Sequence, residues 1–239
     1  MLVLALETSS QRGSVALVED GRLMAHACHD EPNAHGERLL GLMERVLHVA
    51  GRSMRTIDRI AVGRGPGAFT GLRVGLALAQ GIGAGLGIPA IGIGSLRAMA
   101  AAVPDQIDGD RWPIMDARRD EVFVACFRPD GTELLAPHSL PRSGALQSLR
   151  QLAESISPGT GTPRLLGAAL DKFTELIAQG SPFVAYRGEG SDWPGAIAVG
   201  RIACDPNELA PASPDYLRGA DAILPKLPPC PLDLPLEHR

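Results

Sequence analysis

The residues best suited to chemistry lie in the glycine-rich run 63–73, Gly-Arg-Gly-Pro-Gly-Ala-Phe-Thr-Gly-Leu-Arg. The run follows a short apolar segment and precedes a long one, which predicts a turn between a strand and a helix. Thr70 is placed to cap that helix. Backbone N–H groups at a helix start attract anions, so a phosphate or nucleotide contact is one interpretation and a purely structural turn is the other. The candidates for such a contact are Gly65, Gly67, Thr70 and Arg73.

Two acidic residues follow apolar strands at matching places in the two halves of the chain. Glu7 follows the segment 2–6, and Asp116 follows 112–115. An Asp-Gly turn comes later in each half, with an offset of about 110 residues between the halves. This pattern indicates an internal duplication, with a polar linker near 103–111.

The histidines and cysteines do not have the spacing of a metal site. His26 and His29 lie three apart on a predicted strand and should face opposite sides, and His35 stands alone as an expected surface or capping residue. The four cysteines are far apart and are typical of reduced thiols in a cytosolic protein. The net charge of -4 provides no basic field that would hold nucleic acid unaided.

The hydrophobic pattern predicts an α/β chain with two similar halves. The first half, residues 1–103, should hold strands at 2–6, 14–18, 22–28, 60–62 and 88–93, with helices at 35–50 and from about 70 to 87. The second half, residues 104–239, should hold strands at 112–116, 122–127, 132–135 and 164–167, with helices near 146–152, 168–178 and 196–204. The tail from residue 206 is rich in proline and should be irregular.

The helix near 70–87 has an unusual row of small residues. Gly71, Gly75, Ala79 and Gly83 recur every four residues, and residues 74–94 carry no charge. That length could span a bilayer, but the many glycines, Gln80 and Pro89 favour a buried helix followed by a strand. A helix that is apolar all round should be buried all round, which predicts burial against another subunit. The expected interface comprises Leu39, Met43, Val46, Gly71, Leu72, Gly75, Ala79, Ile82 and Gly83.

Four segments together resemble the TsaB (YeaZ) family. They are 62–73, the start at 4–9 with 13–17, the central 116–123 and the late 214–218. The resemblance implies an actin-like, ribonuclease-H-type α/β fold with a duplicated β-β-β-α-β-α unit in two subdomains. It implies a non-catalytic dimerisation subunit for the synthesis of threonylcarbamoyladenosine in tRNA. Its partners would be the catalytic TsaD, then TsaE in a ternary complex, or a second copy when alone, with tRNA bound only through the complex. The location would be cytoplasmic, with no membrane contact.

The resemblance also implies a degenerate cleft at Glu7, Thr8, Ser9 and Asp116. In actin-like kinases the corresponding acids work with metal and phosphates, but Glu7 is one methylene longer than the usual Asp. Ser95 and Met99 stand where TsaD has two histidines, so no metal and no intrinsic cofactor are expected, with at most a contact to ATP or ADP within the complex. An actin-like nucleotide hydrolase and, less favoured, a metallopeptidase are the alternatives.

Overall fold

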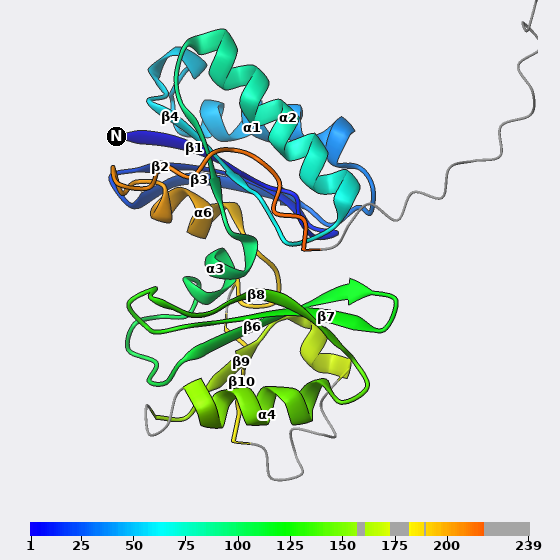
Figure 1. Cartoon of the computed structure of the whole chain (residues 1–239). Helices are drawn as coiled ribbons and strands as arrows, with labels where there is room; N and C mark the ends of the chain where they lie inside the picture. The colour runs from blue at the N-terminus through cyan, green and yellow to red at the C-terminus, as the bar shows by residue number, and fades with distance from the viewer. Residues whose placement is uncertain (157–160, 173–181, 189, 218–239) are drawn as a thin grey trace, which may run out of the picture.

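The computed structural model describes residues 1–156, 161–172, 182–188 and 190–217. These residues form two α/β layers, one above the other, with the short helix α3 between them (Figure 1). No helix in these described ranges combines the length and apolarity needed to cross a bilayer.

The first sheet has the strand order β3-β2-β1-β4-β5. Its strands are β1 (Leu2–Glu7), β2 (Gly13–Glu19), β3 (Arg22–His29), β4 (Arg59–Gly63) and β5 (Ala90–Ile93). The first three form an antiparallel meander, and β4 and β5 add in parallel. Asp20 and Gly21 both have positive φ, as the predicted tight hairpin requires.

The second sheet repeats this arrangement with the order β10-β9-β6-β7-β8. Its strands are β6 (Arg111–Arg118), β7 (Glu121–Phe127), β8 (Glu133–Pro141), β9 (Arg164–Leu166) and β10 (Val184–Tyr186). Again an antiparallel meander is followed by two parallel strands. The sheet order therefore confirms the duplication that the sequence indicated.

The longer helices lie close to their predicted positions. They are α1 (His35–Val49), α2 (Phe69–Leu86), α4 (Ala145–Ile156) and α6 (Ala196–Ile202). Helix α3 (Ser95–Ala100) and the 3-10 helix η1 (Met54–Thr56) were not predicted. Of the predicted helix 168–178, the described part is the 3-10 helix η2 (Ala168–Lys172), and residues 173–181 lie outside the described residues.

Strand β1 is apolar throughout because both faces of its sheet are covered. Leu2, Leu4 and Leu6 pack toward α1 and α2, while Val3 and Ala5 pack toward α6. The second sheet is covered in the same way, by α4 on one face and by α3 on the other. Helix α3 thus sits between the two layers and fixes how they approach each other.

Helix α6 belongs to the first layer, although it follows the whole second sheet in sequence. Ala196 and Val199 pack in one cluster with Val3, Ala5 and Val18. After α6 the chain runs along β5, where Gly92 N–H donates to the Ala210 carbonyl at 2.9 Å. The predicted division at 103/104 did not foresee this return, because the short apolar pattern of α6 does not show which sheet it covers.

The small-residue row of α2 faces the chain's own sheet. Gly71, Gly75, Ala79 and Gly83 are all buried, and a Cβ on Gly71 would collide with the Thr8 carbonyl. Of the nine expected interface residues, only Ile82 is not fully buried; Leu39, Met43, Val46 and Leu72 belong to the core. The idea that these residues form the contact surface is therefore corrected, because each is already packed internally.

Candidate functional site

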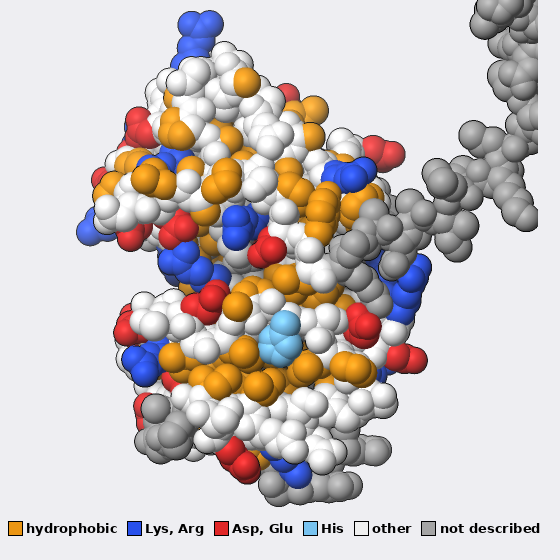
Figure 2. Space-filling view, in the orientation of Figure 1, with side chains coloured by type: hydrophobic (Ala, Val, Ile, Leu, Met, Phe, Trp, Pro, Cys, Tyr) orange, Lys and Arg blue, Asp and Glu red, His pale blue; other side chains and the backbone are white. Residues whose placement is uncertain are grey.

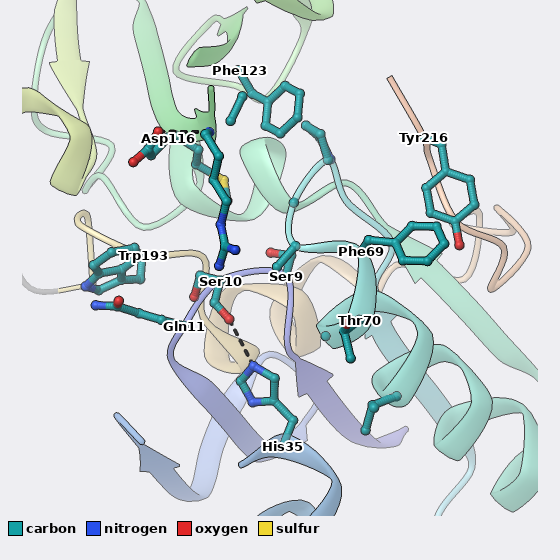
Figure 3. A pocket seen from close by; sticks show the side chains of 18 of the residues that line it. Ser9, Ser10, Gln11, His35, Phe69, Thr70, Asp116, Phe123, Trp193 and Tyr216 are labelled. Atoms are coloured by element: carbon teal, nitrogen blue, oxygen red, sulfur yellow. Dashed lines mark hydrogen bonds between the residues drawn. The ribbon is translucent and has the colours of Figure 1, made fainter. Parts of the chain in front are cut away.

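A cleft of about 630 Å³ opens between the two layers. Figure 3 shows it lined by the β1–β2 turn, the starts of α1 and α2, the β6–β7 turn and the segment 215–217. Its labelled side chains include Ser10, Gln11, Thr70, Asp116 and Trp193. The volume lies in the ordinary range for small-molecule sites.

The glycine-rich run forms one wall of this cleft, and its backbone is largely committed to holding that wall. Gly65 N–H donates to the Ser95 hydroxyl at 3.2 Å, and the Gly65 carbonyl accepts from Ser95 N–H at 2.8 Å. Ala68 N–H donates to the Ser9 carbonyl at 2.7 Å. Gly67 lies against Ser9 with no space for a Cβ. These contacts give the loop a structural role, and the Gly65 N–H that was predicted to meet an anion is already used, whereas Gly67 and Thr70 line the cleft.

Two further expectations for this loop require correction. Helix α2 begins at Phe69, and no side chain caps it, so Thr70 lies inside the first turn and lines the cleft instead. Arg73 is not among the cleft-lining residues. Its guanidinium lies 3.9 Å from the centre of the Phe69 ring, and its Nε donates to the Tyr216 hydroxyl at 3.2 Å.

Glu7 lies beneath the cleft and does not line it. Its side chain is fully buried; one carboxyl oxygen accepts from Ser9 N–H at 2.6 Å and the other from the Ser95 hydroxyl at 3.0 Å. Burial raises the pKa of Glu7, and the hydrogen bonds from Ser9 and Ser95 oppose that rise only in part. Gly63 is required opposite it, because a Cβ there would collide with the carboxyl group. Glu7 therefore joins β1 to α3 and the glycine loop.

The other three predicted cleft residues have two different positions: one is buried and two line the cleft. Thr8 is buried, and its hydroxyl donates to the Gly71 carbonyl at 2.8 Å, so it anchors α2. Ser9 and Asp116 do line the cleft, from opposite layers (Figure 3). Asp116 is exposed; its Oδ1 accepts from Arg118 N–H at 2.9 Å and faces the Arg142 guanidinium at 3.4 Å. The two acids of the duplicated pattern therefore differ in place, because Glu7 is buried below the cleft and Asp116 is exposed in it.

Several cleft residues were not among the predicted site residues, although Arg118, Arg119 and Tyr216 lie in segments that resemble the family. Arg118 and Arg119 line the cleft and, like the neighbouring Asp120, have positive φ although none is glycine. Trp193 and Tyr216 reach the cleft from the returning C-terminal segment. His35 was expected at the surface, yet it is buried beside His29, while His26 is exposed on the opposite face of β3 as predicted.

Replacing Glu7 with glutamine should remove part of the pH dependence of stability. A carboxyl group with a raised pKa keeps its proton in the folded state after the unfolded chain has released it, so stability falls as pH rises above the ordinary Glu range. The amide can still accept from Ser9 N–H and can donate to Ser95. Urea unfolding of both proteins should be measured at pH 5 and pH 8. Between these values the unfolding equilibrium constant of Glu7→Gln, relative to that of the wild type, should fall by roughly tenfold for each pH unit by which the pKa of Glu7 is raised.

Glu44→Gln on the exposed face of α1 is the matched control and should not change this slope. An unchanged slope in Glu7→Gln would contradict the raised pKa of Glu7.

Two meander-based sheets around a central cleft define the class of this protein as an actin-like, two-subdomain fold. The solved component A of (R)-2-hydroxyglutaryl-CoA dehydratase from Acidaminococcus fermentans has this overall fold, with a TM-score of 0.54 at 10% identity over 85% of this chain and 98% of that chain. At that identity the likeness concerns the fold alone.

Closer relatives narrow the class to a family. The family model described as "TsaD: tRNA N6-adenosine threonylcarbamoyltransferase" matches residues 30–155, and the chain belongs to this family, within its TsaB/YeaZ group. Escherichia coli "tRNA threonylcarbamoyladenosine biosynthesis protein TsaB" is 38% identical over 54% of this chain and 56% of its own length. Solved YeaZ from Pseudomonas aeruginosa matches with a TM-score of 0.72 and 28% identity, over 90% of this chain and 99% of that chain. In the sequence comparisons, by contrast, the chain spans about half the length of curated relatives such as the Escherichia coli protein.

Proposed function

We propose that this protein is a non-catalytic subunit in the synthesis of threonylcarbamoyladenosine in tRNA. It would pair with a TsaD-type transferase, join a TsaE-type ATPase in a ternary complex, and contact tRNA only through that assembly. The names of the related proteins indicate the pathway. The observation that carries the non-catalytic role is the position of Glu7, which is sealed under the cleft by Ser9 and Ser95.

The outward faces of α1 and α2 are the proposed contact surface for the partner or for a second copy. Helix α1 exposes Leu40 and Val49, which have relative residue exposures of 55% and 66%. Helix α2 exposes Ala77, Gly81 and Ala84. Figure 2 shows few charged side chains over α2, which Figure 1 places on the outside of the first layer. Small side chains let another helix approach closely.

Reconstitution tests the proposal directly. Purified TsaD-type and TsaE-type proteins from the same organism would be incubated with tRNA, ATP and the threonylcarbamoyl donor, with and without this chain. Threonylcarbamoyladenosine measured by mass spectrometry of digested tRNA should fall to background when the chain is left out. Full modification without the chain would refute the proposed role.

The same preparations separate this function from an actin-like ATPase. The proposal includes no intrinsic cofactor and at most a contact to ATP or ADP within the complex. The chain alone should not hydrolyse ATP. Turnover in the usual enzymatic range of ~1–10³ s⁻¹ that is lost in Asp116→Ala would favour the ATPase instead.

A further inference from the structure

Two buried histidines join the end of β3 to the start of α1. His35 Nδ1 lies 3.1 Å from His29 Nε2, and His35 Nε2 lies 3.0 Å from the Ser10 carbonyl oxygen (Figure 3 shows the second contact). Both side chains are less than a tenth exposed. Gly13 packs against the pair, since a Cβ there would collide with the ring nitrogens of both histidines. The two rings and the β1–β2 turn therefore form one close contact.

The hydrogen bonds fix where the protons are when both rings are neutral. A carbonyl oxygen can only accept, so His35 Nε2 carries a proton and donates it to Ser10. Neutral His35 then has a bare Nδ1, which must accept from a proton on His29 Nε2. His29 Nδ1 is left bare, and it has no hydrogen-bond partner among the described residues.

This chain of bonds tolerates few additional protons. One extra proton must end on His29 Nδ1, where it meets no acceptor in the described part of the chain. A second would place two N–H groups against each other across 3.1 Å. Burial, followed by the neighbouring His35, lowers the pKa of His29.

The charged groups around the pair do not provide it with a dedicated counter-ion. Asp30 and Glu31 follow β3 and favour the charged form of His29, while Arg38 of α1 opposes it. Each acid already has a cation of its own, because Arg12 lies 3.1 Å from Asp30 and Arg38 lies 2.7 Å from Glu31. From α2 the neighbour is Gly71, which does not titrate.

We propose that the His29–His35–Ser10 chain is an acid-released latch, which holds the first turn of α1 on the β1–β2 turn while the histidine pair is neutral and releases it when the pair takes up protons. The latch would fix the relative position of two surfaces. One is the Ser10 and Gln11 wall of the cleft, and the other is the start of α1. The inference goes beyond the proposed function, because it needs no partner and no tRNA.

Nitrogen-edited NMR of the imidazoles at pH 7.5 tests the proton positions in the unmodified protein. His35 should be protonated at Nε2 and bare at Nδ1, and His29 should also be protonated at Nε2. Observation of His35 protonated at Nδ1 instead would overturn the latch without any variant.

Amide hydrogen exchange across pH 7.5 to 5 tests the release. The protection factors of Glu37 and Arg38, whose N–H groups both donate to the Ala34 carbonyl, should fall relative to those of α4. The fall should reach at most about tenfold per pH unit for each proton taken up on opening. His29→Gln should abolish the fall, because a glutamine amide can donate to a neutral His35 or accept from a charged one.

His48→Gln, on the exposed side of the same helix, is the matched control and should behave as the wild type. An equal pH dependence in His29→Gln and in the wild type would overturn the proposal. The tautomer measurement still decides it if His29→Gln does not fold.

Discussion

Replacing Gly71 with alanine should strongly destabilise the protein, whereas Gly81→Ala on the same helix should stabilise it. A Cβ at Gly71 meets the backbone carbonyl of Thr8, which cannot move without displacing β1. The substitution also disturbs the buried hydrogen bond from the Thr8 hydroxyl to the Gly71 carbonyl. Overpacking of ~1–3 kcal/mol and a lost bond of about 1 kcal/mol outweigh the ~1 kcal/mol gain in helix propensity.

Gly81 provides the matched control, because a Cβ there meets nothing within 4 Å and the residue is exposed. Its replacement should yield only the helix-propensity gain of about 0.5–1 kcal/mol. Thermal melting of both variants measures the contrast, at roughly 2–4 °C per kcal/mol for a chain of this size. Equal melting temperatures for Gly71→Ala and the wild type would show that the small-residue row is not packed against the sheet.

Ala77→Arg should weaken association with the proposed TsaD-type partner roughly a hundredfold while leaving the fold intact. Ala77 lies on the exposed side of α2, opposite the buried row, so a long charged side chain there is harmless in the free protein. At a close helix–helix contact it would bury an unpaired guanidinium, at a cost of about 3 kcal/mol or more, which weakens binding roughly a hundredfold. Calorimetric titration with the partner and sedimentation of the protein alone measure the two associations.

Ala136→Arg is the control for the added charge, since Ala136 is an exposed alanine on β8 in the other layer. It should bind the partner as the wild type does. If Ala77→Arg melts normally and still binds with wild-type affinity, the contact surface must be sought away from this face of α2.

The sequence by itself determined most of the architecture. Apolar residues recur every three or four positions in helices, whereas in strands they alternate or form short continuous runs. These patterns therefore located the strands and the longer helices. The repeated strand–acid–turn pattern indicated the duplication that the two sheet orders confirm. The glycine-rich run and three further segments were sufficient to indicate the family, because such turns need particular residues at particular positions.

Only the tertiary structure decided which way the side chains face. A row of small residues predicts close packing but does not say against what, and in α2 the row meets Thr8 and the chain's own sheet. An acid after a strand predicts a side chain that lines the cleft. The Glu7 carboxyl group is instead buried below the cleft, where it accepts hydrogen bonds from Ser9 and Ser95. Three further features depend on contacts between different segments, and local sequence patterns do not record such contacts. They are the pairing of His29 with His35, the packing of α6 on the first sheet and the position of Trp193 in the cleft.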